Sequence, residues 1–183
     1  MGRIEGLLKA YEEFVSQPWP AHLSGPEKVW FAVYEPAQER RLSFRIPEFA
    51  TATAKAGHSW RHVGIGGYFA EWMAGHKYRE AYFEDPEALE LALTDFTAAA
   101  AAQVQAALTA PAVTASTVVA LSGVGALFGL TKTSDILEQV TSHVRGRLLV
   151  FFPGRHENSQ YRLLDARAGW DYLAVPIIAK NGD

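Results

Sequence analysis

A glycine-rich segment, Ser122–Gly129, is the first candidate for ligand chemistry in this sequence. It follows a buried apolar run, as the dinucleotide-binding fingerprint G-x-G-x-x-G does. Its spacing is instead G-x-G-x-x-x-G, and no acidic residue follows the next apolar run to bind a ribose. Ser122 also lacks the G-x-S-x-G context of a nucleophile elbow. We therefore expect a close-packed turn or a partner-contact loop, with a nucleotide- or nucleic-acid-binding regulatory subunit as the alternative.

Two further loops follow apolar runs, at positions where a phosphate site could lie. Glu35–Arg40 has no glycine and no lysine, both of which a phosphate-cradling P-loop needs, so it cannot act as one. Gly64-Ile65-Gly66-Gly67 contains glycines that a tight turn would explain. Neither loop predicts a nucleotide site.

Two histidines, His58 and His62, stand four residues apart, a spacing that on a helix would place both imidazoles on one face for zinc. The surrounding residues favour a strand, in which positions four apart are separated by about 13 Å. A zinc site is therefore not expected. The chain contains no cysteine, which excludes a disulfide framework, a thiolate zinc site and a cysteine nucleophile.

The densest polar cluster is His156-Glu157, with Arg155, Arg162 and Asp165 nearby. Acid–base chemistry is conceivable for these residues, but no serine or metal site completes a catalytic set. We predict a structural loop held by charge-assisted hydrogen bonds. The sequence thus predicts no catalytic residue, no metal and no cofactor.

Five apolar runs predict the strands that would carry these loops: 29–34, 60–65, 117–121, 147–152 and 173–178. Pro153-Gly154 is expected to end the fourth. Helical patterns alternate with the strands and cover 3–16, the segment from Glu35-Pro36 to near Gly57, a short stretch with Phe69 and Trp72, 86–108, and a stretch from Thr133 to about Val144. Pro47 is expected to kink or split the second of these helices.

This alternation predicts one α/β domain over residues 1–183, a three-layer αβα arrangement with a mainly parallel sheet of about five strands. The order of elements resembles the core of a P-loop ATPase whose phosphate loop has been lost. The net charge of −3, with both signs mixed along the chain, gives no basic field for nucleic acid, so direct nucleic-acid binding is not expected. The charged first turns exclude a signal peptide, and no apolar run is long enough to span a membrane, so we expect a cytoplasmic protein.

The C-terminal third carries a resemblance to a known family. Its residues are Phe152-Pro153-Gly154, Glu157-Asn158, the run Tyr161-Arg162-Leu163-Leu164-Asp165-Ala166-Arg167, Gly169-Trp170 and 172–177. Val29-Trp30-Phe31, 69–73 and the glycines of 123–129 add to it. Through these segments the chain resembles the BrxB family of BREX phage-defence systems.

The resemblance implies a role in blocking phage propagation, alongside a PglZ-type phosphatase-fold protein, a large ATPase and a DNA methyltransferase. It implies no enzymatic motif, in agreement with the empty loops above. We therefore expect a non-catalytic adaptor or scaffold that binds the PglZ-type protein and possible further BREX components through the loops at the carboxyl ends of the strands. The residues expected at that interface are Phe128, Arg155, Glu157, Asn158, Tyr161, Arg162, Asp165 and Arg167.

Overall fold

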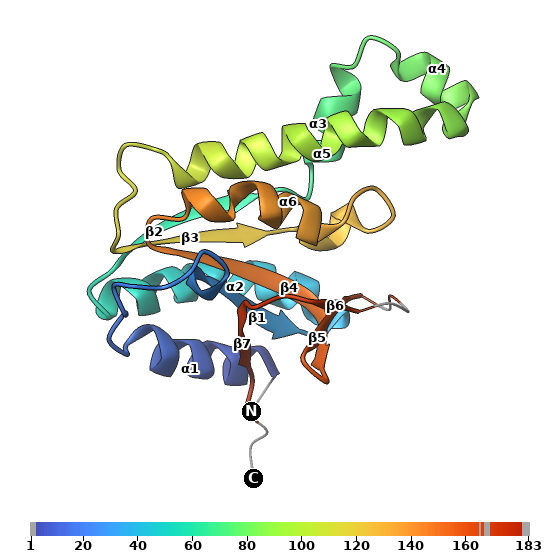
Figure 1. Cartoon of the computed structure of the whole chain (residues 1–183). Coiled ribbons are helices and arrows are strands. Elements are labelled where there is room, and N and C mark those ends of the chain that lie inside the picture. Colours follow the sequence, from blue (N-terminus) through green and yellow to red (C-terminus); the bar gives the residue numbers. More distant parts are fainter. Residues whose placement is uncertain (1–2, 165, 167–168, 181–183) are drawn as a thin grey trace.

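A parallel sheet forms the centre of the fold (Figure 1). The computed structural model describes residues 3–164, 166 and 169–180. The parallel strands are β1 (Val29–Tyr34), β2 (Ser59–Gly64), β3 (Thr117–Ser122), β4 (Arg147–Glu157) and β7 (Val175–Ile178). They lie in the order β2-β3-β4-β1-β7. The predicted mainly parallel sheet is confirmed.

The inner strands are apolar on both sides because helices cover both faces of the sheet. In β1, Trp30, Ala32 and Tyr34 pack on one side, whereas Val29, Phe31 and Val33 pack on the other. The edge strand β2 differs, since its sequence SWRHVG is largely exposed. Continuous burial thus marks β1, β3 and β4 as the inner strands of the parallel sheet.

Helices α1 (Arg3–Val15) and α2 (Glu39–Lys55) cover one face, and α5 (Pro86–Leu108) and α6 (Thr133–Val140) cover the other (Figure 1). The short helices α3 (Tyr68–Ala74) and α4 (Arg79–Glu84) connect β2 to α5. Short 3-10 turns complete the chain at Pro26–Lys28, Pro36–Gln38, Val124–Leu127 and Thr141–His143. The result is the predicted three-layer αβα arrangement.

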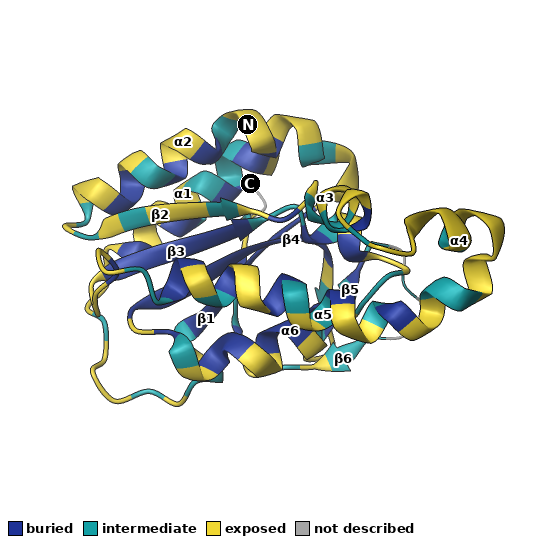
Figure 2. Cartoon of the chain, turned by 90° about the horizontal axis from the view of Figure 1, so that it is seen from above, coloured by how far each residue is buried: buried dark blue, intermediate teal, exposed yellow. Residues whose placement is uncertain are grey.

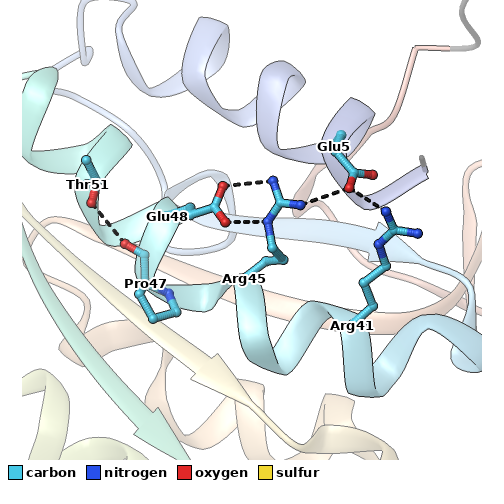
Figure 3. Close-up of polar contacts among 6 residues, drawn as sticks. All are labelled: Glu5, Arg41, Arg45, Pro47, Glu48 and Thr51. Carbon is cyan, nitrogen blue, oxygen red and sulfur yellow. Dashed lines mark hydrogen bonds and ion pairs between the residues drawn. The ribbon is translucent and has the colours of Figure 1, made fainter. Parts of the chain in front are cut away.

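An ion-pair network joins α1 to α2 (Figure 3). Glu5 of α1 lies between the guanidinium groups of Arg41, at 2.5 Å, and Arg45, at 2.8 Å, and Arg45 also pairs with Glu48. Deeper in the same layer, the buried hydroxyl groups of Tyr11 and Thr53 lie 2.6 Å apart. Polar contacts on the surface and in the core therefore hold this pair of helices together.

Helix α2 is continuous through Pro47, so the expected split does not occur. Proline removes one backbone donor and leaves the carbonyl of Ser43 without its helical partner. Both Ser43 and Pro47 are exposed, so water can bind that carbonyl. Helix α6 ends at Val140, earlier than expected, and a 3-10 turn carries the chain on towards Val144.

The prediction that β4 ends at Pro153-Gly154 is wrong. Strand β4 continues to Glu157 and then pairs antiparallel with β5 (Gln160–Leu163), which pairs with β6 (Trp170–Asp171). Proline is tolerated because pairing of β4 with β3 stops at Val150, so no ladder donor is needed on that side. The last expected strand begins at Val175, two residues later than predicted.

Within the part of the chain that the structure describes, no helix combines the length and apolarity needed to cross a membrane.

Candidate functional site

The crevice at the carboxyl ends of the strands is where an open α/β sheet binds its ligand. Here it has a volume of about 300 Å³ and is lined by Pro36, Glu39, Gly66, Gly123, Gly125, Ala126, Pro153 and Leu164. Its one charged lining residue, Glu39, accepts a hydrogen bond from the hydroxyl of Tyr34. Burial and this carboxylate raise the pKa of Tyr34, so the hydroxyl keeps its proton. A carboxylate in this place repels phosphate.

Two glycines of the Ser122–Gly129 loop, Gly123 and Gly125, are packed closely against neighbouring segments. Gly123 has a φ of 84°, and a Cβ there would lie 2.5 Å from the backbone nitrogen of Gly66. A side chain at Gly125 would meet Pro153 at 3.2 Å. The predicted close-packed turn is confirmed: the loop after β3 rests directly on the loop after β2 and on β4.

The two histidines of the 58–62 segment have separate structural roles. The His58 ring stacks on Trp19, with 3.6 Å between ring centroids, and its Nδ1 lies 2.8 Å from the Ser116 hydroxyl. His62 Nε2 lies 2.8 Å from the Ser122 hydroxyl. Among the described residues no cluster of His, Asp and Glu could hold a metal ion. The structure therefore gives no support to a zinc site formed by His58 and His62.

A β-hairpin at the end of β4 holds the polar cluster that the sequence singled out. Asn158 and Ser159 have φ values of 52° and 62°, and they form a two-residue turn with positive φ at both positions. Arg155 pairs with Arg162, and Glu157 pairs with Gln160. The polar cluster thus lies on an antiparallel hairpin held by its backbone ladder. Among the described residues, Arg155, Glu157 and Arg162 form no ion pair, so the predicted charge-assisted hydrogen bonds are not observed.

The strand alternation sorts these residues onto two faces. Arg155, Glu157, Gln160 and Arg162 share the outer face, with Arg155 and Glu157 exposed and Asn158 exposed at the tip. His156 and Tyr161 share the inner face, where their ring centroids lie 4.5 Å apart. Three predicted contact residues therefore form one polar face.

Tyr161 lies in the core and not on that surface. It is fully buried, its ring packs against Phe31 and Phe152, and its hydroxyl donates to the carbonyl of Ala174 at 2.6 Å. Burial raises its pKa, so it remains a neutral hydrogen-bond donor. Tyr161 anchors the hairpin to the core, and in this fold a partner protein cannot contact its side chain.

A cavity of about 510 Å³ lies beside the base of the hairpin. One side is lined by Phe128, by the loop that leads into α6 and by the first turns of α6, namely Gly129, Thr131–Asp135 and Glu138. The other side is lined by Leu163, Ala166, Gly169 and Trp170. Phe128 is 48% exposed at its rim. The structure therefore brings Phe128 and the hairpin together at the same edge of the sheet.

Of the remaining predicted contact residues, Asp165 and Arg167 lie outside the described residues. Sequence reasoning did not place Lys132, Asp135 and Trp170 beside Phe128. The Thr133-Ser134 helix start gave a local signal for the first two residues. Trp170 had no such signal, because its position depends on the pairing of β6 with β5.

The fold and this edge define an α/β protein with a doubly wound parallel sheet. The crevice at the ends of its strands holds a carboxylate, whereas a phosphate site would need hydrogen-bond donors there. The model of the BrxB family, described as BREX protein BrxB, matches residues 78–177, more than half of the chain. The chain belongs to the BrxB family and is therefore a component of a BREX phage-defence system. No curated protein and no solved structure matches it.

Proposed function

We propose that this chain is a non-catalytic adaptor of a BREX system and that it binds the PglZ-type protein through the edge at the carboxyl ends of the strands. We call this edge the strand-end surface and define it as Phe128, Arg155, Glu157, Asn158 and Arg162. The observation that carries the proposal is the joining of a polar hairpin face to an aromatic-lined cavity at the edge where α/β proteins bind ligands.

The chemistry of the strand-end surface suits a protein partner. Arg155 and Arg162 are directly opposite each other, and like charges in that position destabilise a hairpin. A partner carboxylate bound by both guanidinium groups would relieve this repulsion with charge-assisted hydrogen bonds. Phe128 at the cavity rim adds an aromatic anchor of the kind that dominates interface energies.

The proposal is tested by co-expressing tagged chain with the PglZ-type protein and measuring the molar ratio recovered. We expect a defined ratio for the wild type. The double variant Arg155→Glu, Arg162→Glu and the variant Phe128→Ser should each lower recovery at least about tenfold, since truncated anchors and reversed charges cost several kcal/mol at interfaces.

Matched controls come from the opposite face of the sheet. Lys55 is exposed at the far end of α2, and Phe44 of the same helix is 74% exposed. Lys55→Glu and Phe44→Ser should leave recovery unchanged. The proposal fails if the wild type elutes alone, or if the strand-end and control variants behave alike.

A nucleotide-binding regulatory subunit is the alternative function, and the geometry of the crevice does not favour it. Glu39 places a carboxylate in the lining of the crevice, and Gly123 and Gly125 of the loop are packed against neighbouring segments. We expect ATP, GTP, NAD and short DNA to leave the melting temperature unchanged, whereas a bound ligand would raise it by mass action.

A further inference from the structure

A helical arm projects beyond the end of the sheet on the α5 side (Figure 1). It consists of α4, its flanking loops and the first half of α5, and we define it as residues 76–95. The buried residues of α5 begin only at Ala92, and α4 has none. Figure 2 shows the same segment as an exposed extension of the molecule. The arm is therefore longer than packing on the sheet requires.

The arm exposes large apolar side chains. Tyr78 is 55% exposed, Phe83 is 74% exposed and Leu91 is 86% exposed. By contrast, Phe96, five residues beyond Leu91, is fully buried against Tyr68, Phe69 and Trp72. Isolated exposed apolar residues are ordinary, but three large ones on one projecting segment mark a contact surface.

The arm also concentrates the negative charge of the chain. Residues 76–95 contain six carboxylates and two cations, a net charge of −4, whereas the whole chain carries −3. All six carboxylates are exposed, and within the described residues none of them pairs with Lys or Arg. On α5, Glu87 and Asp95 stand one helical turn before and after Leu91, on the same face. The exposed apolar groups are thus bracketed by carboxylates.

We infer that the arm is a docking element for a second protein surface, one that presents Lys and Arg around an apolar depression. Charge complementarity selects this occupant, because an acidic rim steers towards a basic partner and repels an acidic one. A second copy of the chain would bring two surfaces of −4 together, and the phosphates of nucleic acid would be repelled in the same way. The arm, residues 76–95, and the strand-end surface have no residue in common, so this inference does not rest on the proposed function.

The test places a photo-crosslinking amino acid, p-benzoylphenylalanine, at Phe83 or at Phe44, in cells that express the chain together with the other proteins of its BREX system. The two positions are equally exposed, at 74%, but Phe44 lies on α2 across the sheet. We expect a protein adduct from position 83 and little from position 44. Mass spectrometry should map the adduct to a segment of another protein with Lys and Arg around apolar residues.

A charge variant makes the test specific. Glu84→Lys, Glu90→Lys and Asp95→Lys together change the arm from −4 to +2 and leave the helix-capping residues Asp85 and Glu87 in place. We expect this triple variant to lower the yield of the adduct at least about tenfold, because like charges across an interface repel each other. Circular dichroism of the variant should match the wild type.

The inference is overturned if position 83 gives no more adduct than position 44, or if the triple variant leaves the yield unchanged. An adduct with a second copy of the chain, with nucleic acid or with an acidic segment also overturns it. The strand-end variant Arg155→Glu, Arg162→Glu should leave the adduct intact, which separates the failure of one surface from the failure of the other.

Discussion

The two helical layers of this protein use their length differently. Helices α1 and α2 bury a residue in nearly every turn, from Ile4 to Val15 and from Leu42 to Thr53, and ion pairs join them. On the other face, α5 packs along its second half, and its first half extends outward with α4. The α1–α2 layer thus packs on the sheet along its whole length. The other layer extends beyond the sheet, and this extension is free to contact another molecule.

The largest expected effect separates the packed layers from the arm. Phe49→Ala in α2 and Phe96→Ala in α5 should each lower the free energy of unfolding by about 3–5 kcal/mol, because both side chains are fully buried. Phe83→Ala in the arm should change it by less than about 0.5 kcal/mol. Urea unfolding followed by circular dichroism measures all three. A loss at Phe83 comparable to that at Phe96 would show that the arm belongs to the core.

The next largest effect on stability is expected where the loop after β3 packs against the segment that leads into α3 and the arm. Gly123 contacts Gly66, two residues before α3, and a Cβ at Gly123 would clash with that backbone. Gly123→Ala should lower the free energy of unfolding by about 2–4 kcal/mol, because the positive φ and the clash both destabilise the folded state.

Gly129 is the matched control for this substitution. Its φ of 79° is similar, but a Cβ there would meet nothing within 4 Å. Gly129→Ala should therefore cost only the backbone strain, about 1–2 kcal/mol. Equal thermal destabilisation by the two substitutions would contradict the packing role of Gly123.

A smaller effect tests the hydrogen bond inside the α1–α2 layer. Tyr11→Phe removes a buried hydroxyl that bonds Thr53. The cost should be about 1 kcal/mol, since the Thr53 hydroxyl still donates to the Phe49 carbonyl. Tyr78→Phe in the arm should have no measurable effect, because Tyr78 is exposed. The denaturant midpoints of both variants measure these changes in stability. A Tyr11→Phe variant as stable as the wild type would contradict a stabilising role for this hydrogen bond.

The smallest effect is the acid response of the α1–α2 ion pairs. A backbone donor in the first turn of α1, and then Arg41, hold the pKa of Glu5 below its usual value of 4.5. A carboxyl with a lowered folded pKa stabilises the protein above its unfolded pKa and loses this contribution as the pH falls through the folded value. Between pH 7 and pH 3 the wild type should therefore lose more stability than Glu5→Gln. Thermal melts across that range compare the two, and parallel curves would contradict the role of Glu5.

Local signals predicted much of this fold. The acidic cap Asp85 with Pro86 placed the start of α5, and the apolar run of β1 gave both of its ends. Both features depend on neighbouring residues alone. Where pairing partners lie far apart or lack a sequence signal, prediction failed. Asn158-Ser159 lacks the glycine that usually marks such a hairpin turn, so β5 was missed and β4 was cut short.

In the candidate site, too, features set by the order of elements could be predicted, whereas features set by distant pairing could not. The strand-end position of Phe128, Arg155, Glu157 and Asn158 followed from the order of elements, because loops after parallel strands gather at one edge. The burial of Tyr161 did not, since it depends on which face of the unpredicted hairpin meets the core. The arm was missed as a surface because its helix was predicted without the width of the sheet beneath it.

The central claim is that the strand-end surface, and not the α1–α2 layer, binds the PglZ-type protein. Hydrogen–deuterium exchange of the chain, free and in complex with that protein, tests it most directly. We expect slower exchange on binding in residues 123–130 and 154–163, with exchange in α1 and α2 unchanged. Protection confined to α1 and α2, with free exchange at the hairpin, would contradict it.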